Sequence, residues 1–162
     1  MFDVVLYQPE IPPNTGNIIR LCANTGLALH LIAPLVFDMQ ERRLRRAGLD
    51  YREWARVRIH DSLDAYLNAA RPARLLAFST RARRDYASIE YRCGDALLFG
   101  PETRGLPRQV LNRARPSEQA RIPMRPGNRS LNLSNAVAVV CYEAWRQHDF
   151  AGHAADGREQ QS

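Results

Sequence analysis

The most informative stretches of the sequence are LLFGPETRGLP at residues 97–107, and RIPM at residues 121–124, which continues to SLNLSNA at residues 130–136. In each stretch an apolar run of strand length leads into a loop rich in glycine, proline or small polar residues, and a helical pattern follows. Loops at the carboxyl ends of strands bind ligands in α/β proteins, because they expose backbone groups and are free of packing. The sequence therefore predicts that the two loops are walls of one small-molecule site.

The rest of the chain alternates in the same way. Strands are predicted at residues 4–7, 29–33, 57–59, 74–79 and 96–100, and helices at residues 17–25, 41–47, 62–70, 107–113 and 133–145. This alternation indicates an α/β protein with a mostly parallel sheet flanked by helices. The length of 162 residues predicts a single domain over residues 1–150, and residues 151–162, which lack periodicity, are expected to form a disordered tail.

The charge of the chain points to a polyanionic partner. The formal net charge is +6, and all 23 basic residues are arginine. The absence of lysine excludes a Schiff-base lysine, a lysine general base and a P-loop lysine. Arginine forks bind phosphates and stack on bases, so nucleic acid is a natural partner. A bias in genomic base usage could explain the preference for arginine, but not the net charge.

The remaining titratable residues give no sign of a metal site. Cys22, Cys93 and Cys141 are far apart and form no C-x-x-C pair, so neither a disulfide framework nor a zinc site is predicted. The four histidines show no metal-ligand spacing. No segment approaches the roughly 20 apolar residues of a membrane span, and the N-terminus does not resemble a signal peptide. We therefore expect a soluble cytoplasmic protein without membrane contact.

A third informative loop, PEIPPNTGNIIR at residues 9–20, follows the first predicted strand, where a dinucleotide fingerprint would otherwise lie. Asn14 or Thr15 is expected to cap the helix that follows, and Gly16 permits a close backbone approach. Asn17 and Arg20 would share one helix face and hold a phosphate or ribose hydroxyl near the helix start. The pattern is equally that of a capped helix with a solvated arginine.

Together, residues 13–20, 99–107, 122–124 and 130–136 resemble the motifs of the knotted SPOUT superfamily of RNA methyltransferases, in the same order. Within it, the chain is similar to the single-domain branch that 2′-O-methylates the wobble nucleotide, cytidine or uridine 34, of leucine tRNAs. The likeness runs from Val4 to Gln147. It implies a C-terminal deep trefoil knot that forms the pocket for S-adenosylmethionine, with S-adenosylhomocysteine as product, and a homodimer that binds the tRNA anticodon stem-loop.

The resemblance also implies roles for individual residues. The cofactor contacts would come from the ends of strands and the loops after them: Phe78, Ser79, Gly100, Glu102, Ile122, Met124, Ser130 and Leu131. Glu102 could instead act as a general base or pair with Arg104. The catalytic residues would be Arg20, with Asn14 and Asn135 orienting the site unless these asparagines are ordinary helix caps. Because a guanidinium stays protonated, we expect Arg20 to hold a phosphate and stabilise the developing alkoxide.

RNA contacts are expected from the basic segment and dimer contacts from the last helix. Arg42, Arg43, Arg45 and Arg46 would hold the anticodon stem, or else form a solvated helix face. The stripe Leu133, Ala136, Val137, Val140, Cys141 and Ala144 is expected to be buried, and the resemblance implies that its helix packs against a second copy. The alternatives are 2′-O-methylation of another tRNA or rRNA position, and a non-catalytic RNA- or cofactor-binding protein.

Overall fold

The computed structural model describes residues 1–37, 56–128 and 130–153. The helix predicted at residues 41–47, with Arg42, Arg43, Arg45 and Arg46, lies outside the described residues, as does most of the tail predicted at residues 151–162. The first three residues of that tail are described, and residues 151 and 152 form a turn.

The described residues form a seven-stranded sheet in which every pairing is parallel. Its strands are β1 (Asp3–Tyr7), β2 (Ala28–Ile32), β3 (Val57–His60), β4 (Arg74–Phe78), β5 (Arg84–Asp85), β6 (Asp95–Phe99) and β7 (Gln119–Arg121). The strand order is β3-β2-β1-β6-β4-β7-β5. The predicted α/β class is thus confirmed. The strand expected at residues 121–124 corresponds to β7, which ends at Arg121 before the apolar residues, whereas β5 was not predicted, because a strand of two residues carries no readable periodicity.

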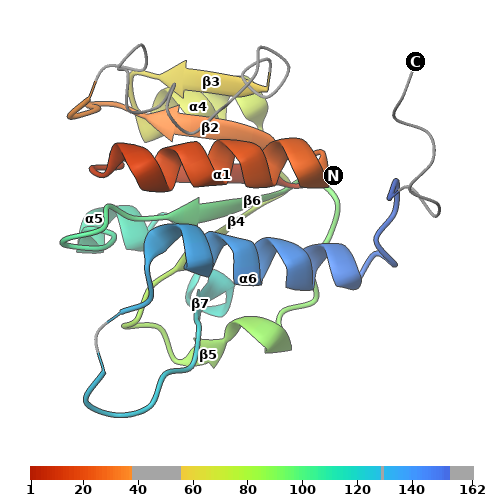
Figure 1. Cartoon of the computed structure of the whole chain (residues 1–162). Coiled ribbons are helices and arrows are strands. Elements are labelled where there is room, and N and C mark those ends of the chain that lie inside the picture. The colour runs from red at the N-terminus through yellow and green to blue at the C-terminus, as the bar shows by residue number, and fades with distance from the viewer. Residues whose placement is uncertain (38–55, 129, 154–162) are drawn as a thin grey trace.

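Helices cover both faces of the sheet. The long helices α1 (Pro12–Thr25) and α6 (Leu133–Arg146) lie side by side on one face (Figure 1). Helices α4 (Leu63–Ala70) and α5 (Arg108–Leu111) pack on the other face. The short 3-10 helices η1 (Tyr86–Ser88) and η2 (Pro116–Glu118) flank β5 and β7.

The two-residue period of the strands divides the core between these faces. Val4 and Leu6 of β1 pack in the cluster that contains α1 and α6, whereas Val5 packs in the cluster that contains α4 and α5. The predicted stripe of α6 is buried, except that Ala136 is only half-buried. Both sheet faces are therefore covered, as a parallel sheet requires.

The start of α1 differs from the prediction. The helix begins at Pro12 rather than Asn17, because proline needs no hydrogen bond for a backbone N–H in the first turn. Its N-cap is Ile11, which makes no side-chain cap, so the prediction that Asn14 or Thr15 caps this helix was wrong. Asn14 is thereby left with its carboxamide available for other contacts.

Strand β7 lies between two strands that precede it in the sequence, an arrangement consistent with a C-terminal segment that threads through an earlier loop. Strand β7 pairs with β4 on one side and β5 on the other, although β4 and β5 are consecutive in the chain. The chain therefore returns after β6 and inserts between two earlier strands before α6 crosses to the face of α1. The trefoil knot itself stays a prediction from the resemblance.

Candidate functional site

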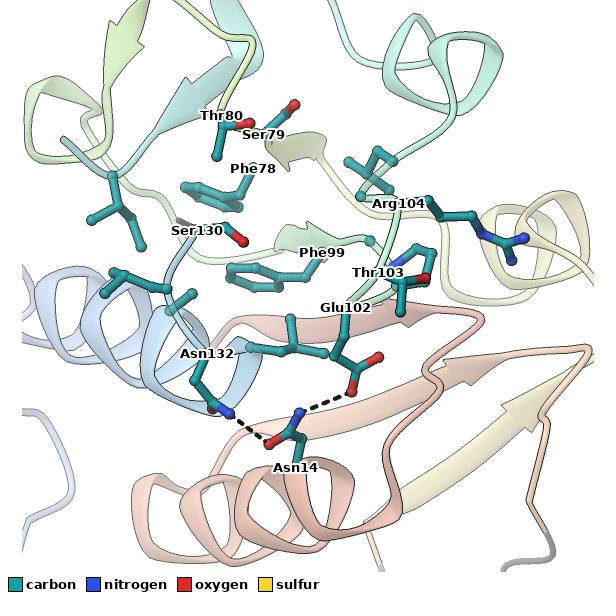
Figure 2. Close-up of a pocket in the computed structure, with 18 of the residues that line it drawn as sticks. Asn14, Phe78, Ser79, Thr80, Phe99, Glu102, Thr103, Arg104, Ser130 and Asn132 are labelled. Atoms are coloured by element: carbon teal, nitrogen blue, oxygen red, sulfur yellow. Dashed lines mark hydrogen bonds between the residues drawn. The ribbon is translucent and has the colours of Figure 1, made fainter. Parts of the chain in front are cut away.

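The loops after β4, β6 and β7 meet the start of α1 around a cavity of about 460 Å³ at the carboxyl end of the sheet (Figure 2). Its volume lies in the range of small-molecule sites. The eight residues predicted to contact a cofactor all line this cavity: Phe78, Ser79, Gly100, Glu102, Ile122, Met124, Ser130 and Leu131. The two loops thus form walls of one cavity, as predicted, and the contacts of these eight residues with a cofactor stay predictions.

Two aromatic rings form one wall of the cavity. Phe78 and Phe99 are the last residues of the neighbouring strands β4 and β6 and lie in register. Their rings are stacked, with centroids 4.9 Å apart and an interplanar angle of 13°. Both side chains are buried, yet both line the cavity, so they present apolar aromatic surface to an occupant.

Gly100 lets the loop after β6 fold back on itself. A Cβ atom at this position would lie 2.3 Å from the backbone nitrogen of Leu106 and 2.5 Å from the carbonyl carbon of Gly105. The turn is closed by the N–H of Gly105, which donates to the carbonyl of Pro101 over 2.9 Å. Only glycine fits here without displacing backbone atoms.

The carboxylate of Glu102 binds the start of α1. It accepts hydrogen bonds from the backbone N–H of Glu10 (2.8 Å), from the backbone N–H of Ile11 (3.2 Å) and from the side-chain amide of Asn14 (3.1 Å). A negative charge at a helix N-terminus is favourable, and the orphan N–H groups need acceptors. Glu102 does not pair with Arg104, which donates to Gln8. Its role toward a cofactor stays a prediction.

A second contact between the same two loops runs in the opposite direction. The Glu10 carboxylate accepts from the backbone N–H of Thr103 (3.1 Å) and from its hydroxyl (2.6 Å). The hydroxyl hydrogen bond in particular lowers the pKa of Glu10 below its ordinary value, and burial opposes it. The loop before α1 and the loop after β6 are thus held together by reciprocal hydrogen bonds that the carboxylates of Glu102 and Glu10 accept.

Asn132 is a site residue that the sequence interpretation missed. It is the N-cap of α6, where its Oδ1 accepts from the backbone N–H of Ser134 (2.9 Å) and more weakly from that of Asn135 (3.4 Å). Its Nδ2 donates to Oδ1 of Asn14 over 2.9 Å. An asparagine directly before a helical pattern is an N-cap signal, which could have identified the cap but not its partner.

The structure brings one of the three predicted catalytic residues to the cavity. Asn14 lines it and is buried, whereas Arg20 and Asn135 are exposed and are not among the lining residues. Arg20 follows Asn14 by six positions, which turns it about 240° around the helix axis. Its side chain therefore belongs to a different face of α1, and the catalytic roles of Arg20 and Asn135 stay predictions.

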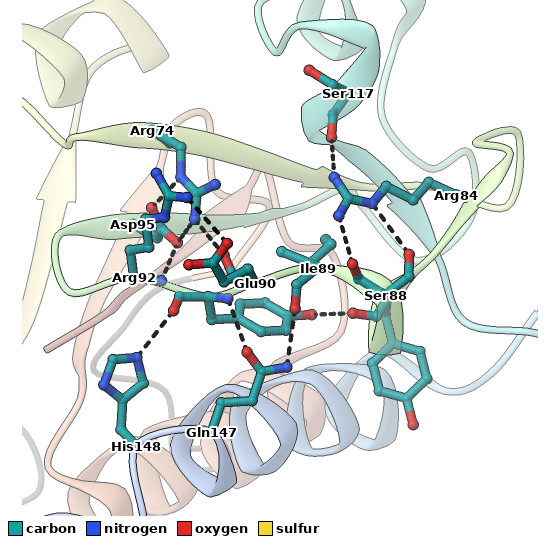
Figure 3. Close-up of polar contacts among 12 residues, drawn as sticks. Arg74, Arg84, Ser88, Ile89, Glu90, Arg92, Asp95, Ser117, Gln147 and His148 are labelled. Atoms are coloured by element: carbon teal, nitrogen blue, oxygen red, sulfur yellow. Dashed lines mark hydrogen bonds and ion pairs between the residues drawn. The ribbon is translucent and has the colours of Figure 1, made fainter.

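A polar network at the opposite end of the strands is structural (Figure 3). Asp95, which is fully buried, accepts two hydrogen bonds from Arg74 (2.8 and 2.6 Å) and one from the backbone N–H of Arg92 (2.8 Å). Gln147 at the end of α6 binds both the N–H of Tyr91 and the carbonyl of Ile89 (3.0 Å each). These contacts hold the segment that leads into β6.

The described ranges hold neither a candidate metal site nor a candidate membrane span. Residues 1–37, 56–128 and 130–153 contain no group of three or more histidine, cysteine or acidic residues that could hold a metal ion. No helix within them is long and apolar enough to span a bilayer.

Comparison with known proteins identifies the family. The model of the SpoU rRNA methylase family matches residues 1–142. The chain belongs to this family. A relative from Methylovorus glucosotrophus, named tRNA (cytidine(34)-2′-O)-methyltransferase, is 55% identical over 152 residues, which cover 94% of this chain and 99% of the relative. The Escherichia coli K12 protein of the same name is also 55% identical, over 94% of this chain and 97% of its own length.

Solved structures agree with this assignment. A structure described as giving insights into 2′-OH methylation of C/U34 on tRNA superimposes with a TM-score of 0.84 and 50% identity, and the match covers 92% of this chain and 97% of that one. The resemblance to the SPOUT RNA methyltransferases, inferred from three motifs, is therefore confirmed.

Proposed function

We propose that this chain is a tRNA 2′-O-methyltransferase that transfers a methyl group from S-adenosylmethionine to the ribose of nucleotide 34. The observation that carries the proposal is the 55% identity to enzymes of that name over nearly the full length of both chains. The cavity supports it, because it lies where the three motifs meet and has the size of a small-molecule site.

The lining residues fit S-adenosylmethionine. The stacked rings of Phe78 and Phe99 offer apolar surface for an adenine, and Ser79 and Ser130 offer hydroxyl groups. The loop 100–106 folds back tightly beside the cavity because Gly100 has no side chain to meet the backbone of Gly105 and Leu106. S-adenosylmethionine supplies a methyl group on a sulfonium, so the leaving group departs neutral as S-adenosylhomocysteine and needs neither an acid nor a metal.

The residues of this chain supply alignment and charge stabilisation. Holding the ribose oxygen in line with the methyl group can lower the barrier by up to about 7–11 kcal/mol, the range of well-oriented intramolecular reactions. We assign to Arg20 the binding of the phosphate beside the target ribose and the stabilisation of the developing alkoxide, since a fork of charged donors suits both. Water or a phosphate oxygen takes the proton that leaves the 2′-hydroxyl. Asn14 and Asn135 orient the site in this proposal.

A homodimer belongs to the proposal. Helices α1 and α6 lie side by side on one face of the sheet (Figure 1), and α6 carries the exposed apolar residues Val139 and Tyr142. Arg20 lies on the exposed part of α1 rather than in the cavity of its own chain, as expected if this face meets a second copy. Sedimentation of the purified protein tests this, and a monomer at micromolar concentration contradicts it.

The identity of the tRNA and the part of it that is bound follow only from the resemblance to the single-domain branch of the SPOUT methyltransferases. We propose that the enzyme acts in the cytoplasm on leucine tRNAs and binds their anticodon stem-loop. Arg42, Arg43, Arg45 and Arg46 are the candidates for holding that stem. Replacing all four arginines with uncharged residues would weaken tRNA binding and reduce its salt dependence, because each phosphate contact releases counterions.

Ribosomal RNA is the second candidate substrate. A structure of an AdoMet-bound rRNA methyltransferase from Sinorhizobium meliloti is 27% identical, with a TM-score of 0.78, and the match covers 90% of this chain but only 56% of that protein. Transfer of labelled methyl from S-adenosylmethionine to tRNA and rRNA, both from a strain lacking the endogenous activity, separates the candidates. Label in tRNA supports the proposal, label in rRNA moves the target, and cofactor binding without label indicates a non-catalytic binding protein.

A further inference from the structure

Asn132 uses both ends of its carboxamide, and each end serves a different helix. The oxygen caps α6 by accepting from the backbone N–H groups of Ser134 and Asn135 and from the Ser134 hydroxyl. The nitrogen donates to Asn14 in the first turn of α1. One side chain in the loop between β7 and α6 thus joins the starts of the two long helices (Figure 2).

The direction of this hydrogen-bond chain is fixed at both ends. The ionised carboxylate of Glu102 can only accept, so the amide nitrogen of Asn14 must face it and the amide oxygen must face Asn132. The backbone N–H groups of α6 can only donate, so Oδ1 of Asn132 must face them. Asn132 is therefore required to be a donor toward Asn14, because any other amide orientation would leave a donor facing a donor or an acceptor facing an acceptor.

The residues of this hydrogen-bond series also line the cofactor cavity. Asn14, Glu102 and Asn132 are lining residues, and Asn132 directly follows Ser130 and Leu131, two residues expected to contact the cofactor. Glu102 in turn holds the backbone N–H groups of Glu10 and Ile11. An occupant that orders residues 130–132 therefore acts, through Asn132 and Asn14, on the helix that carries Arg20.

We propose that Asn132 is a positioning residue that couples cofactor binding to the placement of α1 and hence of Arg20. The inference rests on the proposed methyl transfer. It differs from a general structural role, because it requires the Nδ2 donor of Asn132 in addition to its capping oxygen.

The substitution Asn132→Asp separates these two functions. Aspartate caps helices as well as asparagine, so α6 keeps its cap, but an ionised carboxylate cannot donate to Asn14. We expect kcat to fall about tenfold or more, the range for losing a hydrogen bond and leaving its acceptor unpaired, while the Kd for S-adenosylhomocysteine changes less than about threefold. Lowering the pH should raise the activity of the variant relative to the parent enzyme, because a protonated carboxyl donates again.

The matched control is Asn132→Ser, which caps α6 but carries no group that titrates in this range. It should lose activity to a similar degree and show a constant ratio to the parent enzyme across the same pH range. It also carries the test if Asn132→Asp does not fold. A Kd that weakens as much as kcat falls, or activity within twofold of the parent in both variants, overturns the inference.

Amide hydrogen exchange gives a readout that does not depend on activity. S-adenosylhomocysteine should slow exchange at Glu10 and Ile11 in the parent protein and leave it nearly unchanged in Asn132→Asp. Equal protection in the parent and the variant overturns the inference alone. If the parent does not bind S-adenosylhomocysteine at all, the proposed function fails together with the inference.

Discussion

Replacing Gly100 with alanine tests the packing that shapes the cavity. The added Cβ would lie 2.3 and 2.5 Å from backbone atoms of Leu106 and Gly105, about 1 Å inside normal contact, and neither atom can rotate away. Overpacking of this kind costs about 1–3 kcal/mol, and here the loop must open to relieve it. If that cost falls on the bound state, cofactor affinity weakens about 5- to 150-fold, since 1.4 kcal/mol corresponds to tenfold.

Calorimetric titration with S-adenosylhomocysteine measures this effect, with thermal unfolding as a check on folding. Gly105→Ala is the matched control in the same loop, because nothing lies within 4 Å of its added Cβ and only its positive φ of 64° is strained. We expect the control to weaken binding less than Gly100→Ala. Binding by Gly100→Ala within twofold of the parent would refute the argument that the loop needs this close approach.

Three further predictions concern stability and pH. Burial first, and then the charges of His30 and Arg58, lower the pKa of His60 below 6.5, so the unfolded chain binds a proton that the folded chain does not. The free energy of unfolding should therefore fall as the pH drops below about 6.5. Urea unfolding of His60→Gln should show a weaker fall over the same pH range. Asp95→Ala leaves Arg74 without its buried partner and should lose about 3–5 kcal/mol in denaturant unfolding, whereas a loss below 1 kcal/mol would contradict the buried-pair argument. Gln147→Ala removes both bonds to the segment at Ile89 and Tyr91 and should lower stability by about 1–3 kcal/mol, seen as faster unfolding in stopped-flow experiments; an unchanged unfolding rate would show that these bonds do not hold the segment.

The sequence predicted the elements whose signal is local. The strands ending at Phe78 and Phe99 are continuous apolar runs, and the helix from Leu133 has a clear apolar stripe, so all three elements were placed within a residue or two. The cavity followed, because loops at strand ends must share one edge of a parallel sheet. The motif resemblance then added the identity of the ligand, which periodicity cannot give.

The parts that could not be predicted depend on contacts distant in sequence. Strand β7 lies between β4 and β5, and nothing within its three residues indicates this position. The carboxylate of Glu102 was assigned three alternative roles because its true partners at Glu10, Ile11 and Asn14 are about ninety positions away. Asn132 was missed for the same reason, although its capping position was readable.

A pair of leucine tRNAs tests whether the enzyme transfers methyl to the 2′-oxygen of nucleotide 34. One tRNA carries a ribose at position 34 and the other a 2′-deoxyribose there, with all other nucleotides identical. We predict that labelled methyl from S-adenosylmethionine enters the first tRNA, is recovered in the 2′-O-methylated nucleoside of position 34, and does not enter the second. Equal label in both tRNAs, or none in either despite binding of S-adenosylhomocysteine, would contradict it.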